Sequence, residues 1–436
     1  MIITIVGGYG AMGRWLVKLL KEKGFEVRIS GRNAKVGEAF ARKMRVEFFT
    51  DNVEAVKEAD VVIVSVPISV TEEVIKEIAP HMKDGSLLMD IASIKEGPAN
   101  AMLKYAKESV ELIPAHPMFG PSAPDLKGQV VLLTPLRSEI WLPRVKSFLE
   151  KEGARVHITT PEEHDRIMSI IQGLTHFVYI ATGITLGDLN VDVEYTKRFA
   201  SPVYQMMLDM IARIVGQDPH MYAMIQIYNP RNFDIHSKFI ENAESLRKII
   251  IEGRKEDFVE KMSKAARKLG DVEGALRRSD KAIRSLYKEL ELLKSKLGEN
   301  VVLRHVYSKN FHYGKLKHVD PENVILETKK GDITLKTSNI EVLSDEDANN
   351  WIIQNFPKKN RDFSFVVEEK ADNEIIRYVF SLIPNVTSVE IIDEYKGPQI
   401  PEGKKSITLR VVSPSIYGDE VFRRTEEIIN SLFKMR

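Results

Sequence analysis

"IITIVGGYGAMGRWLVKLLKEKG" (residues 2–24) places several glycines between an apolar run and an amphipathic segment. The run Ile2–Val6 is apolar at all but one position and rich in β-branched residues, which is typical of a strand covered on both faces, as in a parallel sheet. Apolar side chains recur at helical spacing after Gly13, and Gly24 supplies a stop signal. The stretch therefore predicts a strand, a glycine-rich turn and a helix.

The glycines match those that a dinucleotide-binding turn requires. In such a turn one glycine can take a positive φ, one lets the backbone approach a pyrophosphate, and one lets helix and strand pack closely, with the anion at the helix N-terminus. A lone G-x-G-x-x-G motif is a weak signal, and a plain glycine-rich turn is the alternative, but the strand-turn-helix context favours the dinucleotide site. The predicted cofactor-binding residues are Gly8, Tyr9, Gly10, Ala11, Met12, Gly13, Ser30, Arg32, Val66 and Pro67.

The end of the second predicted strand bears on the choice of nicotinamide cofactor. In proteins that bind NAD, an acidic residue about 20 residues past the glycines holds the ribose 2′-hydroxyl. Here Ser30, Gly31, Arg32 and Asn33 take this place. No carboxylate there repels a phosphate, and Arg32 can bind one through two hydrogen bonds. We therefore expect NADP, with NAD as the second choice; the alternative is that Arg32 is a solvated loop residue.

Strands and helices continue to alternate through the first 158 residues. Apolar segments at 59–67 and 85–93 indicate buried strands, and an amphipathic helix lies between them. Two further strands of the same sheet are expected in VELIPAHPMFGP (110–121) and GQVVLLTP (128–135). This alternation predicts an α/β Rossmann-type fold with a doubly wound parallel sheet, whose ligand crevice lies at the carboxyl ends of the strands.

Three polar residues follow strand ends and should face this crevice. An imidazole at His116 can accept a proton near neutrality and polarise a hydroxyl as hydride leaves the carbon that carries it. A histidine that caps a loop is equally consistent with this position. Ser93 can hydrogen-bond the imidazole or a substrate oxygen, and Lys95 can hold a carboxylate. From the residues alone, a helix N-cap and a surface charge are the better interpretation of Ser93 and Lys95.

Residues 159–298 are almost entirely helical in pattern, with apolar side chains recurring at three and four. Several segments are apolar on more than one face, which predicts burial against a second subunit. Gln172 and His176 stand four apart and so share a helix face. Arg231 lies beside Pro230, where a helix is interrupted, and a buried arginine needs an anion. A structural ion pair is the slightly favoured partner.

The composition excludes several classes of protein. There is no cysteine, so disulfides and cysteine-ligated metals are excluded, and a reducing cytoplasm is expected. The formal net charge is +1, so no field of the whole chain attracts nucleic acid or membrane. The longest apolar runs, such as Val61–Val66, are too short to span a bilayer, and the N-terminus carries no leader pattern. We expect a soluble protein without a metal or a membrane contact.

The pattern changes beyond Gly298. Glu322–Ser344 has short alternating runs with a turn at residues 330–332, which predicts a small β-hairpin segment without an assigned function. From residue 351 the order strand, helix, strand, strand, helix predicts a ferredoxin-like α+β sandwich. Because the chain ends with the second predicted helix, we expect the final strand of this fold to be missing. "NRDFSFVV" and "YKGPQIPEGKKSITLRV" resemble the ferredoxin-fold anticodon-binding domain of the phenylalanyl-tRNA synthetase β-subunit.

Seven stretches of residues 1–290 together resemble the prephenate dehydrogenase family, in order and in spacing. "HPMFGP" and "SIK" are the most diagnostic, and "EEHDRIMSIIQGLTHF" and "NPRN" agree as well. The resemblance implies oxidative decarboxylation of prephenate to 4-hydroxyphenylpyruvate in tyrosine biosynthesis, and a homodimer formed through the helical domain. Prephenate carries two carboxylates, so its site needs cations.

The resemblance also implies roles for individual residues. His116 matches the catalytic histidine, which accepts a hydrogen bond from the ring hydroxyl in its neutral form, and Ser93 matches the serine that orients it. Arg231 and His176 match substrate-binding residues. Lys95 and Gln172 are expected at the same substrate site, Gln172 on the basis of its helix face alone.

Three functions remain open at this point. A prephenate dehydrogenase is preferred, and an arogenate or related hydroxy-acid dehydrogenase is the first alternative. The second is an RNA-binding or regulatory protein, in which Lys358, Lys359, Arg361, Lys404 and Lys405 contact phosphates. The expected domains are a dinucleotide-binding domain at 1–158, a helical substrate and dimerisation domain at 159–298, a small β segment at 299–350, and a ferredoxin-like domain at 351–436.

Overall fold

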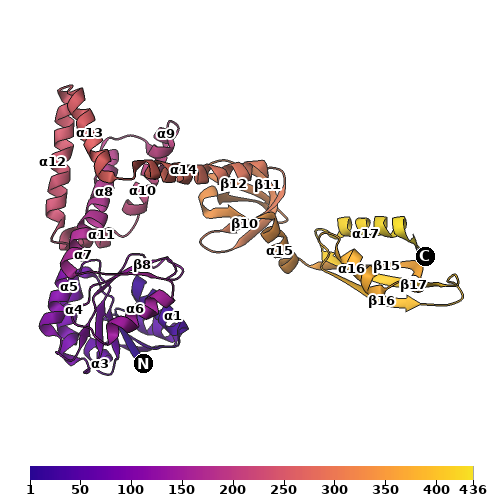
Figure 1. Cartoon of the computed structure of the whole chain (residues 1–436), viewed down its shortest axis with the longest axis horizontal. Helices are drawn as coiled ribbons and strands as arrows, with labels where there is room; N and C mark the ends of the chain where they lie inside the picture. The colour runs from indigo at the N-terminus through magenta and orange to yellow at the C-terminus, as the bar shows by residue number, and fades with distance from the viewer. Residues whose placement is uncertain (436) are drawn as a thin grey trace. The chain divides into compact units, whose positions relative to one another are not determined.

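The computed structural model of the chain describes residues 1–435, without the side chains of residues 286, 434 and 435. It contains two compact units, residues 1–268 and the chain from 269 onward (Figure 1). The first unit holds a doubly wound sheet and a helical region. The second holds a small β-sheet and an α+β sandwich.

The N-terminal sheet is parallel throughout and has the strand order β3-β2-β1-β4-β5-β6. Its order reverses between β1 and β4, which creates the crevice where doubly wound folds bind their ligands. The predicted Rossmann-type sheet is therefore confirmed. Its strands are β1 (Ile2–Val6), β2 (Glu26–Ser30), β3 (Glu47–Phe49), β4 (Val61–Val64), β5 (Leu87–Asp90) and β6 (Glu111–Leu112).

Helices cover both faces of this sheet, because the strands carry apolar side chains on both. One core cluster joins the sheet to α1, α2 and α6, through residues such as Val17 and Phe40. The other joins it to α3, α4 and α5, through residues such as Ile75 and Met102. The helices are α1 (Ala11–Glu22), α2 (Ala34–Met44), α3 (Asn52–Val56), α4 (Ile68–Ile78), α5 (Glu96–Tyr105) and α6 (Trp141–Lys151).

One prediction about this domain was wrong. Only Glu111–Leu112 of the segment 110–121 joins the parallel sheet. The following strands, β7 (Ala115–Pro117) and β8 (Val130–Leu133), form a separate sheet with β9 (Arg155–Ile158), in which β7 pairs antiparallel and β9 parallel to β8. His116 therefore lies on this second sheet and not at the edge of the first.

The helical region begins with α7 (Pro161–Met168), which Thr160 caps by accepting a hydrogen bond from the Glu163 amide. A π-helical turn, η2 (Ser169–Leu174), continues directly into α8 (Thr175–Asp188). Such turns often mark functional sites. The remaining helices are α9 (Val193–Lys197), α10 (Pro202–Val215), α11 (Pro219–Tyr228), α12 (Asn232–Ile251) and α13 (Lys255–Leu269).

The continuous helical stretch Pro161–Asp188 is long and apolar enough to cross a membrane, by length and composition alone. The sequence prediction of no membrane-length segment was wrong by this criterion, because it counted consecutive apolar residues rather than average hydropathy. α8 has no fully buried residue in the single chain. An apolar helix without buried residues needs another apolar surface to cover it.

The second unit begins with α14 (Val272–Ser295), which packs on β11 and β14 and places Leu293 in their core. The sequence assigned this helix to the preceding helical region. The predicted hairpin is present as β12 and β13, but within a five-stranded antiparallel sheet of order β13-β12-β11-β10-β14. The strands are β10 (Asn300–His305), β11 (Phe311–Val319), β12 (Asn323–Thr328), β13 (Gly331–Lys336) and β14 (Ile340–Val342).

Helix α15 (Asp345–Asn355) precedes the ferredoxin-like sandwich. The sandwich sheet has the order β16-β17-β15-β18, and Phe365, Phe380 and Ile429 belong to its core. The expected loss of the final strand was wrong, because β18 pairs with β15 at Phe365 and Val366. The elements are β15 (Lys358–Glu368), α16 (Asn373–Ser381), β16 (Ser388–Tyr395), β17 (Lys404–Pro414), α17 (Gly418–Leu432) and β18 (Lys434–Met435).

Candidate active site

The glycine-rich turn after β1 has the geometry of an anion site. Gly10 precedes α1 in an extended conformation, and no side chain caps the helix, so the first amides of α1 are left for a ligand. The positive φ belongs to Gly7, one residue before the motif, at +82°. A Cβ on Gly13 would lie 2.6 Å from the Gly7 carbonyl oxygen, so this glycine allows helix and strand to pack.

The end of β2 lies beside this turn. The Ser30 hydroxyl is buried and has no hydrogen-bond partner within the part of the chain that the structure describes. Tyr9 packs over Gly31, where a Cβ would lie 2.5 Å from the ring, and its hydroxyl accepts a hydrogen bond of 2.8 Å from the Asn33 amide. Arg32 is exposed. The unpaired Ser30 hydroxyl and the uncapped N-terminus of α1 fit a dinucleotide.

His116 forms a buried hydrogen-bonded chain with two residues of α7. Its Nδ1 lies 2.9 Å from Nε2 of His164, and Nδ1 of His164 lies 2.7 Å from Oδ1 of Asp165. All three residues are at most 3% exposed. The Asp165 carboxylate also accepts hydrogen bonds from the amides of Lys95 and Glu96, at 2.8 and 2.9 Å. These bonds fix the carboxylate at the start of α5.

This chain determines where the imidazole protons lie. A carboxylate is only an acceptor, so Nδ1 of His164 must be the donor to Asp165. In neutral His164, Nε2 is then an acceptor for the Nδ1 proton of His116. His116 is consequently left with an unprotonated Nε2, the form required of a proton acceptor. A carboxylate plays the same orienting role behind the catalytic histidine of serine proteases.

The surroundings keep His116 neutral. Burial, and then the electrostatic influence of His164 and Lys95, hold the pKa of His116 well below the ordinary imidazole value of 6.5. A neutral imidazole at physiological pH can accept a proton from a substrate hydroxyl. The side chain is therefore prepared for general-base chemistry.

Lys95 does not have the role that was expected of it. Its ammonium is fully buried, 2.5 Å from Oδ2 of Asp90 and 2.7 Å from the carbonyl oxygen of Ala115. Burial lowers the pKa of Lys95 and raises the pKa of Asp90, and each charge opposes the shift of the other. The ammonium has no exposed face for a substrate carboxylate. It joins the end of β5 to the strand of His116 instead.

Ser93 lies in the loop after β5 and is partly exposed. Within residues 1–435 it makes no hydrogen bond to His116 or to another protein group. Its predicted role, orienting imidazole and hydroxyl, is neither supported nor excluded by a contact and stays a prediction.

Arg231 lies on the same hydrogen-bonded network. Its guanidinium binds Oε1 of Glu96, with Nε at 3.1 Å and Nη2 at 3.0 Å, so the structural ion pair favoured from the sequence is present. The Glu96 amide donates to Asp165, which leads on through His164 to His116. Arg231 is 48% exposed and not buried, so it can exchange Glu96 for a ligand carboxylate.

The segment "NPRN" (229–232) connects the helical region to the hydrogen-bonded chain of His116, His164 and Asp165. The Asn229 amide donates to the Asp165 carbonyl at 2.9 Å. Asn232 caps the end of α11 by donating to the carbonyls of Ile225 and Gln226. It also packs so closely on the π-helical turn that a Cβ on Gly173 would lie 2.1 Å from its Oδ1.

Polar atoms without partners gather around this π-helical turn. Oε1 of Gln172 and Nδ1 of His176 are buried and unpaired within the described chain, as are both amide atoms of Gln226. Burial lowers the pKa of His176, whose ring lies against Tyr222 at 4.7 Å. Buried polar groups without partners are costly unless a ligand or water satisfies them. The two predicted substrate residues therefore carry buried polar atoms that a ligand or water would have to satisfy.

Sequence reasoning missed His164 and Asp165, although a signal for them exists. In α7 the buried residues are Pro161, His164, Asp165 and Met168, at the spacing of the apolar face of an amphipathic helix. A histidine and an aspartate at core positions need partners in the interior. That pattern could have identified them as part of a buried polar network.

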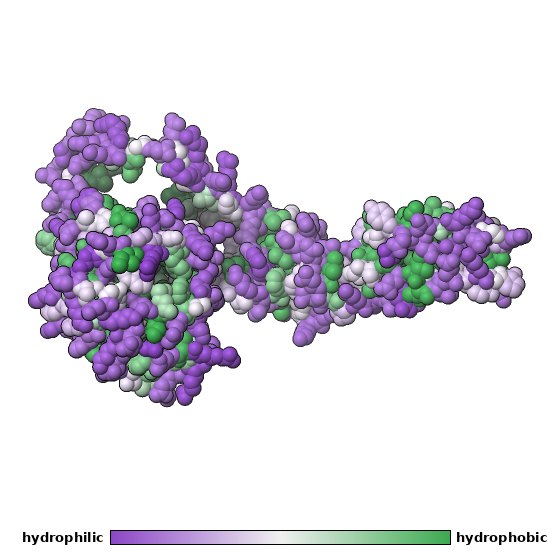
Figure 2. Space-filling model, turned by 60° about the horizontal axis from the view of Figure 1, so that its bottom comes forward, coloured by the Kyte–Doolittle hydropathy of each residue, from purple (hydrophilic) through white to green (hydrophobic). Residues whose placement is uncertain are grey.

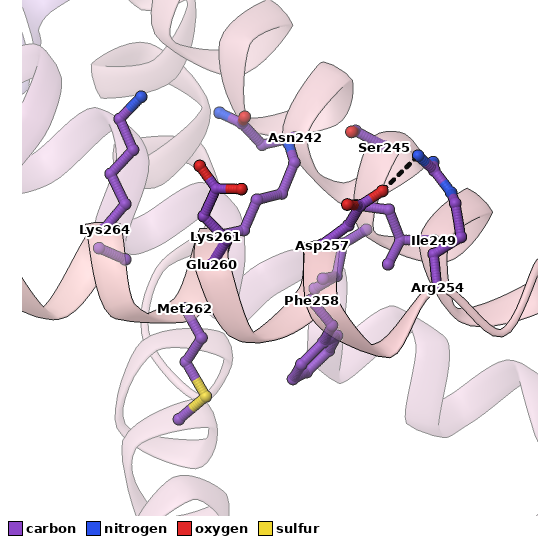
Figure 3. Close-up of a pocket in the computed structure, with 12 residues that line it drawn as sticks. Asn242, Ser245, Ile249, Arg254, Asp257, Phe258, Glu260, Lys261, Met262 and Lys264 are labelled. Atoms are coloured by element: carbon purple, nitrogen blue, oxygen red, sulfur yellow. Dashed lines mark hydrogen bonds and ion pairs between the residues drawn. The ribbon is translucent and has the colours of Figure 1, made fainter.

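A cavity of about 830 Å³ lies between α12 and α13 (Figure 3). In this view Asp257 extends from α13 and is paired with Arg254, at 2.5 Å. None of the residues of the His116 network lines this cavity. It is therefore distinct from the candidate active site.

Three family models match parts of the chain. They describe the nucleotide-binding domain of prephenate dehydrogenase at residues 16–158, its dimerization domain at 160–264, and a ferredoxin-fold anticodon binding domain at 354–432. A probable arogenate/prephenate dehydrogenase of Methanocaldococcus jannaschii is 42% identical over 415 residues, or 94% of this chain and 92% of the relative. The T-protein of Enterobacter agglomerans is 31% identical, over 62% of this chain and 68% of its own.

Solved structures agree in fold with residues of the first unit. The prephenate dehydrogenase of A. aeolicus, in complex with hydroxyphenyl propionate and NAD+, has a TM-score of 0.52 at 23% identity. It covers 62% of this chain and 98% of its own. The arogenate dehydrogenase of Synechocystis has a TM-score of 0.50 at 20% identity, with the same two shares.

Proposed function

The chain belongs to the prephenate dehydrogenase family, and from this premise we propose that it oxidatively decarboxylates prephenate to 4-hydroxyphenylpyruvate with NADP. The observation that carries the proposal is the buried chain from His116 through His164 to Asp165. It leaves Nε2 of a neutral imidazole as the proton acceptor, and we propose that this nitrogen lies beside the nicotinamide in the crevice of the dinucleotide-binding sheet. Such a base, beside a hydride acceptor, suits the oxidation of a carbinol carbon.

The reaction needs little more than alignment and a proton acceptor. The bound nicotinamide supplies the hydride acceptor. Nε2 of His116 takes the proton of the ring hydroxyl as the carbon–hydrogen bond breaks and the carbonyl forms. Loss of carbon dioxide then restores an aromatic ring, and the phenol oxygen takes back a proton. His164 and Asp165 hold the imidazole in the accepting tautomer.

Arg231 is the cation that we propose for a substrate carboxylate. It is half exposed, and its Glu96 partner is 23% exposed, so a carboxylate can replace Glu96 without leaving a buried charge unpaired. Gln172 of the π-helical turn and His176 at the start of α8 supply further hydrogen bonds. Lys95 acts indirectly in this account, as a positioning residue between Asp90 and the His116 strand.

NADP is favoured over NAD by the end of β2. Ser30, Gly31, Arg32 and Asn33 offer no carboxylate, and Arg32 is exposed beside the ribose end of the site. An acidic residue in this place would hold the 2′-hydroxyl and repel a phosphate. The names of the relatives do not decide this point, since they include both an NAD+ complex and NADP(+) enzymes.

A homodimer accounts for the exposed apolar helices. Large apolar side chains of the helical region, among them Ile184, Phe199 and Phe233, are 59–77% exposed in the single chain. Figure 2 shows hydrophobic side chains deep between the helices of this region, behind a hydrophilic outer rim. An apolar surface of this extent marks an interaction site. A second copy placed on α8 would also explain a membrane-length helix in a cytoplasmic enzyme.

An RNA-binding function is disfavoured by the charges of the C-terminal domain. Residues 354–432 hold 11 Lys and Arg against 13 Asp and Glu, a net charge of −2. Four of the five proposed phosphate contacts are paired with carboxylates: Lys359 with Asp419, Arg361 with Glu426, Lys404 with Glu368 and Lys405 with Glu394. Nucleic-acid sites need unneutralised cations. We assign this domain no role in the reaction.

A spectrophotometric assay tests the proposal. The purified protein is mixed with prephenate or arogenate and with NADP or NAD, and the reduced cofactor is followed at its absorbance. We expect the highest kcat/KM with prephenate and NADP. Turnover of arogenate but not prephenate would overturn the substrate and favour the second candidate, which the name of the M. jannaschii relative includes.

A further inference from the structure

A second cavity lies behind the catalytic strands. It has a volume of about 310 Å³ and is lined by α1, α6 and strands of both N-terminal sheets. Its lining is apolar apart from Arg144 at the rim, and two tryptophans, Trp15 and Trp141, contribute to it. None of the residues assigned above to substrate or cofactor lines it. Its chemistry is therefore separate from that of the active site.

Strand alternation connects this cavity to the catalytic residues. Successive side chains of a strand point to opposite faces. Ala115 and Pro117 line the cavity, whereas His116 between them points to His164. Met89 lines it too, whereas Asp90 points to Lys95. The cavity is the reverse side of the two strand ends on which the active site is built.

The size and lining of the cavity indicate its ligand. An apolar cavity of about 150 Å³ binds benzene, and small-molecule pockets begin at about 300 Å³. An empty apolar cavity destabilises a protein in proportion to its volume, and water gains no hydrogen bonds there. Aromatic rings at Trp15, Phe119 and Trp141 favour edge contacts with another ring. The lining has no carboxylate to pair with an ammonium group, which excludes a zwitterionic amino acid.

We propose that this cavity binds a small uncharged aromatic molecule of one or two rings, and that its occupation alters the rate of the reaction at His116. A ligand would contact Ala115 and Pro117 directly, and these residues flank the imidazole. It would also contact Met89, which precedes the Asp90 partner of Lys95. Small shifts of packed strands change catalytic geometry, because a displacement of about 1 Å costs up to about a hundredfold in rate.

The binding experiment titrates the full-length protein with 5-fluoroindole and follows the ¹⁹F resonance, without substrate or cofactor. It compares the wild type with Val145→Phe and Ser147→Phe. Val145 lines the cavity, whereas Ser147 is exposed on the same helix and does not line it. Both variants therefore add a phenyl ring to α6, one inside the cavity and one outside. If Val145→Phe does not fold, Leu19→Phe fills the cavity from α1.

We expect saturable binding of 5-fluoroindole to the wild type and to Ser147→Phe, and at least a tenfold loss of affinity in Val145→Phe. Absence of saturable binding to the wild type would overturn the proposal. Equal affinity in all three proteins would overturn it as well, because the ligand would then bind elsewhere. The result does not depend on the assigned reaction, since no turnover is measured.

The coupling to catalysis is tested by steady-state kinetics at saturating 5-fluoroindole. We expect a change in kcat of at least twofold at unchanged KM in the wild type and Ser147→Phe, and none in Val145→Phe. An increase in KM alone, equal in all three proteins, would place the compound in the catalytic cleft. Unchanged kinetics in spite of binding would contradict the coupling. Failure of the wild type to turn over prephenate at all would count against the proposed function instead.

Discussion

At the scale of single residues, the proposed mechanism depends on a short buried chain of hydrogen bonds. Asp165 fixes the tautomer of His164, and His164 fixes that of His116, through contacts of 2.7 and 2.9 Å. Arg231 reaches the same chain through Glu96 and Asp165. The proposed proton acceptor and the proposed substrate cation thus come from different parts of the first unit and share one network.

Replacement of the intermediate histidine should separate positioning from cofactor binding. In His164→Asn the imidazole of His116 loses its acceptor, so we expect kcat to fall about tenfold to a hundredfold. The KM for NADP should stay within about twofold. His157→Asn, at an exposed position on β9, is the matched control and should behave as the wild type. Wild-type kcat in His164→Asn would show that the chain through His164 does not orient the proposed base, His116.

The depressed pKa of His116 predicts how stability depends on pH. The unfolded chain takes up a proton at this residue near pH 6.5, whereas the folded protein does so only well below that value. The free energy of unfolding should therefore decrease as the pH falls below about 6.5. Urea unfolding at pH 7 and pH 5 should show a smaller loss in His116→Asn than in the wild type. An equal loss in both proteins would contradict a buried neutral imidazole.

Cofactor selectivity is a single-residue question as well. We expect Arg32→Ala to raise the Kd for NADP about tenfold to a hundredfold, which is the value of a charge-assisted hydrogen bond. The Kd for NAD should change by less than about twofold. Quenching of tryptophan fluorescence by each cofactor measures both constants. A parallel loss of affinity for NAD and NADP would mean that Arg32 does not contact the 2′-phosphate.

At the scale of elements, much of the fold was predictable. The parallel sheet was predicted from apolar runs that alternate with amphipathic helices. Both patterns depend only on residues that are close together in the sequence. The pairing of β7 with β8 and β9 was not predictable, because nothing in a short apolar run tells which sheet it joins. The π-helical turn at Ser169–Leu174 was not predictable either, because the spacing of the apolar residues does not reveal it.

The candidate site was predictable to a similar degree. Strand ends indicated His116, although its strand belongs to the second sheet, and its place at the ligand crevice stays a prediction. Lys95 was assigned to substrate because the sequence cannot show that a lysine is buried against Asp90. His164 and Asp165 were missed because each gains its meaning from a partner 48 to 70 residues away.

The exposed face of α8 makes a prediction at this scale. A charge at Ile184, which is 59% exposed in the single chain, should destabilise a dimer formed over α8. We expect Ile184→Glu to elute with the mass of a monomer in light-scattering chromatography, where the wild type has the mass of a dimer. Leu103→Glu, at a 49% exposed position on α5, is the control and should stay dimeric. A dimeric Ile184→Glu would place the interface elsewhere.

At the scale of the whole molecule, the chain joins a dehydrogenase unit to a domain matched by an anticodon-binding model. The match describes a fold, and fold alone does not determine function. Four of the five candidate phosphate contacts of this domain are paired with carboxylates, and its charges sum to a slightly negative value. They differ from the basic face that a phosphate backbone requires.

This charge pattern predicts a negative result with RNA. In a gel-shift assay with bulk tRNA at 50 mM salt, we expect no complex at protein concentrations up to about 10 μM, since specific and non-specific sites both depend on free cations. The double variant Asp419→Asn, Glu426→Gln releases Lys359 and Arg361 from their partners and is the comparison. Binding by the wild type that higher salt abolishes would revive the RNA-binding alternative.

The most direct test of the account is a single-turnover experiment with prephenate and excess enzyme loaded with NADP. It compares the wild type, His116→Asn and the exposed control His157→Asn, by absorbance of the reduced cofactor. We predict that His116→Asn binds NADP normally but forms reduced cofactor at least a hundredfold more slowly than the other two. Equal rates in all three proteins would contradict an imidazole base at position 116.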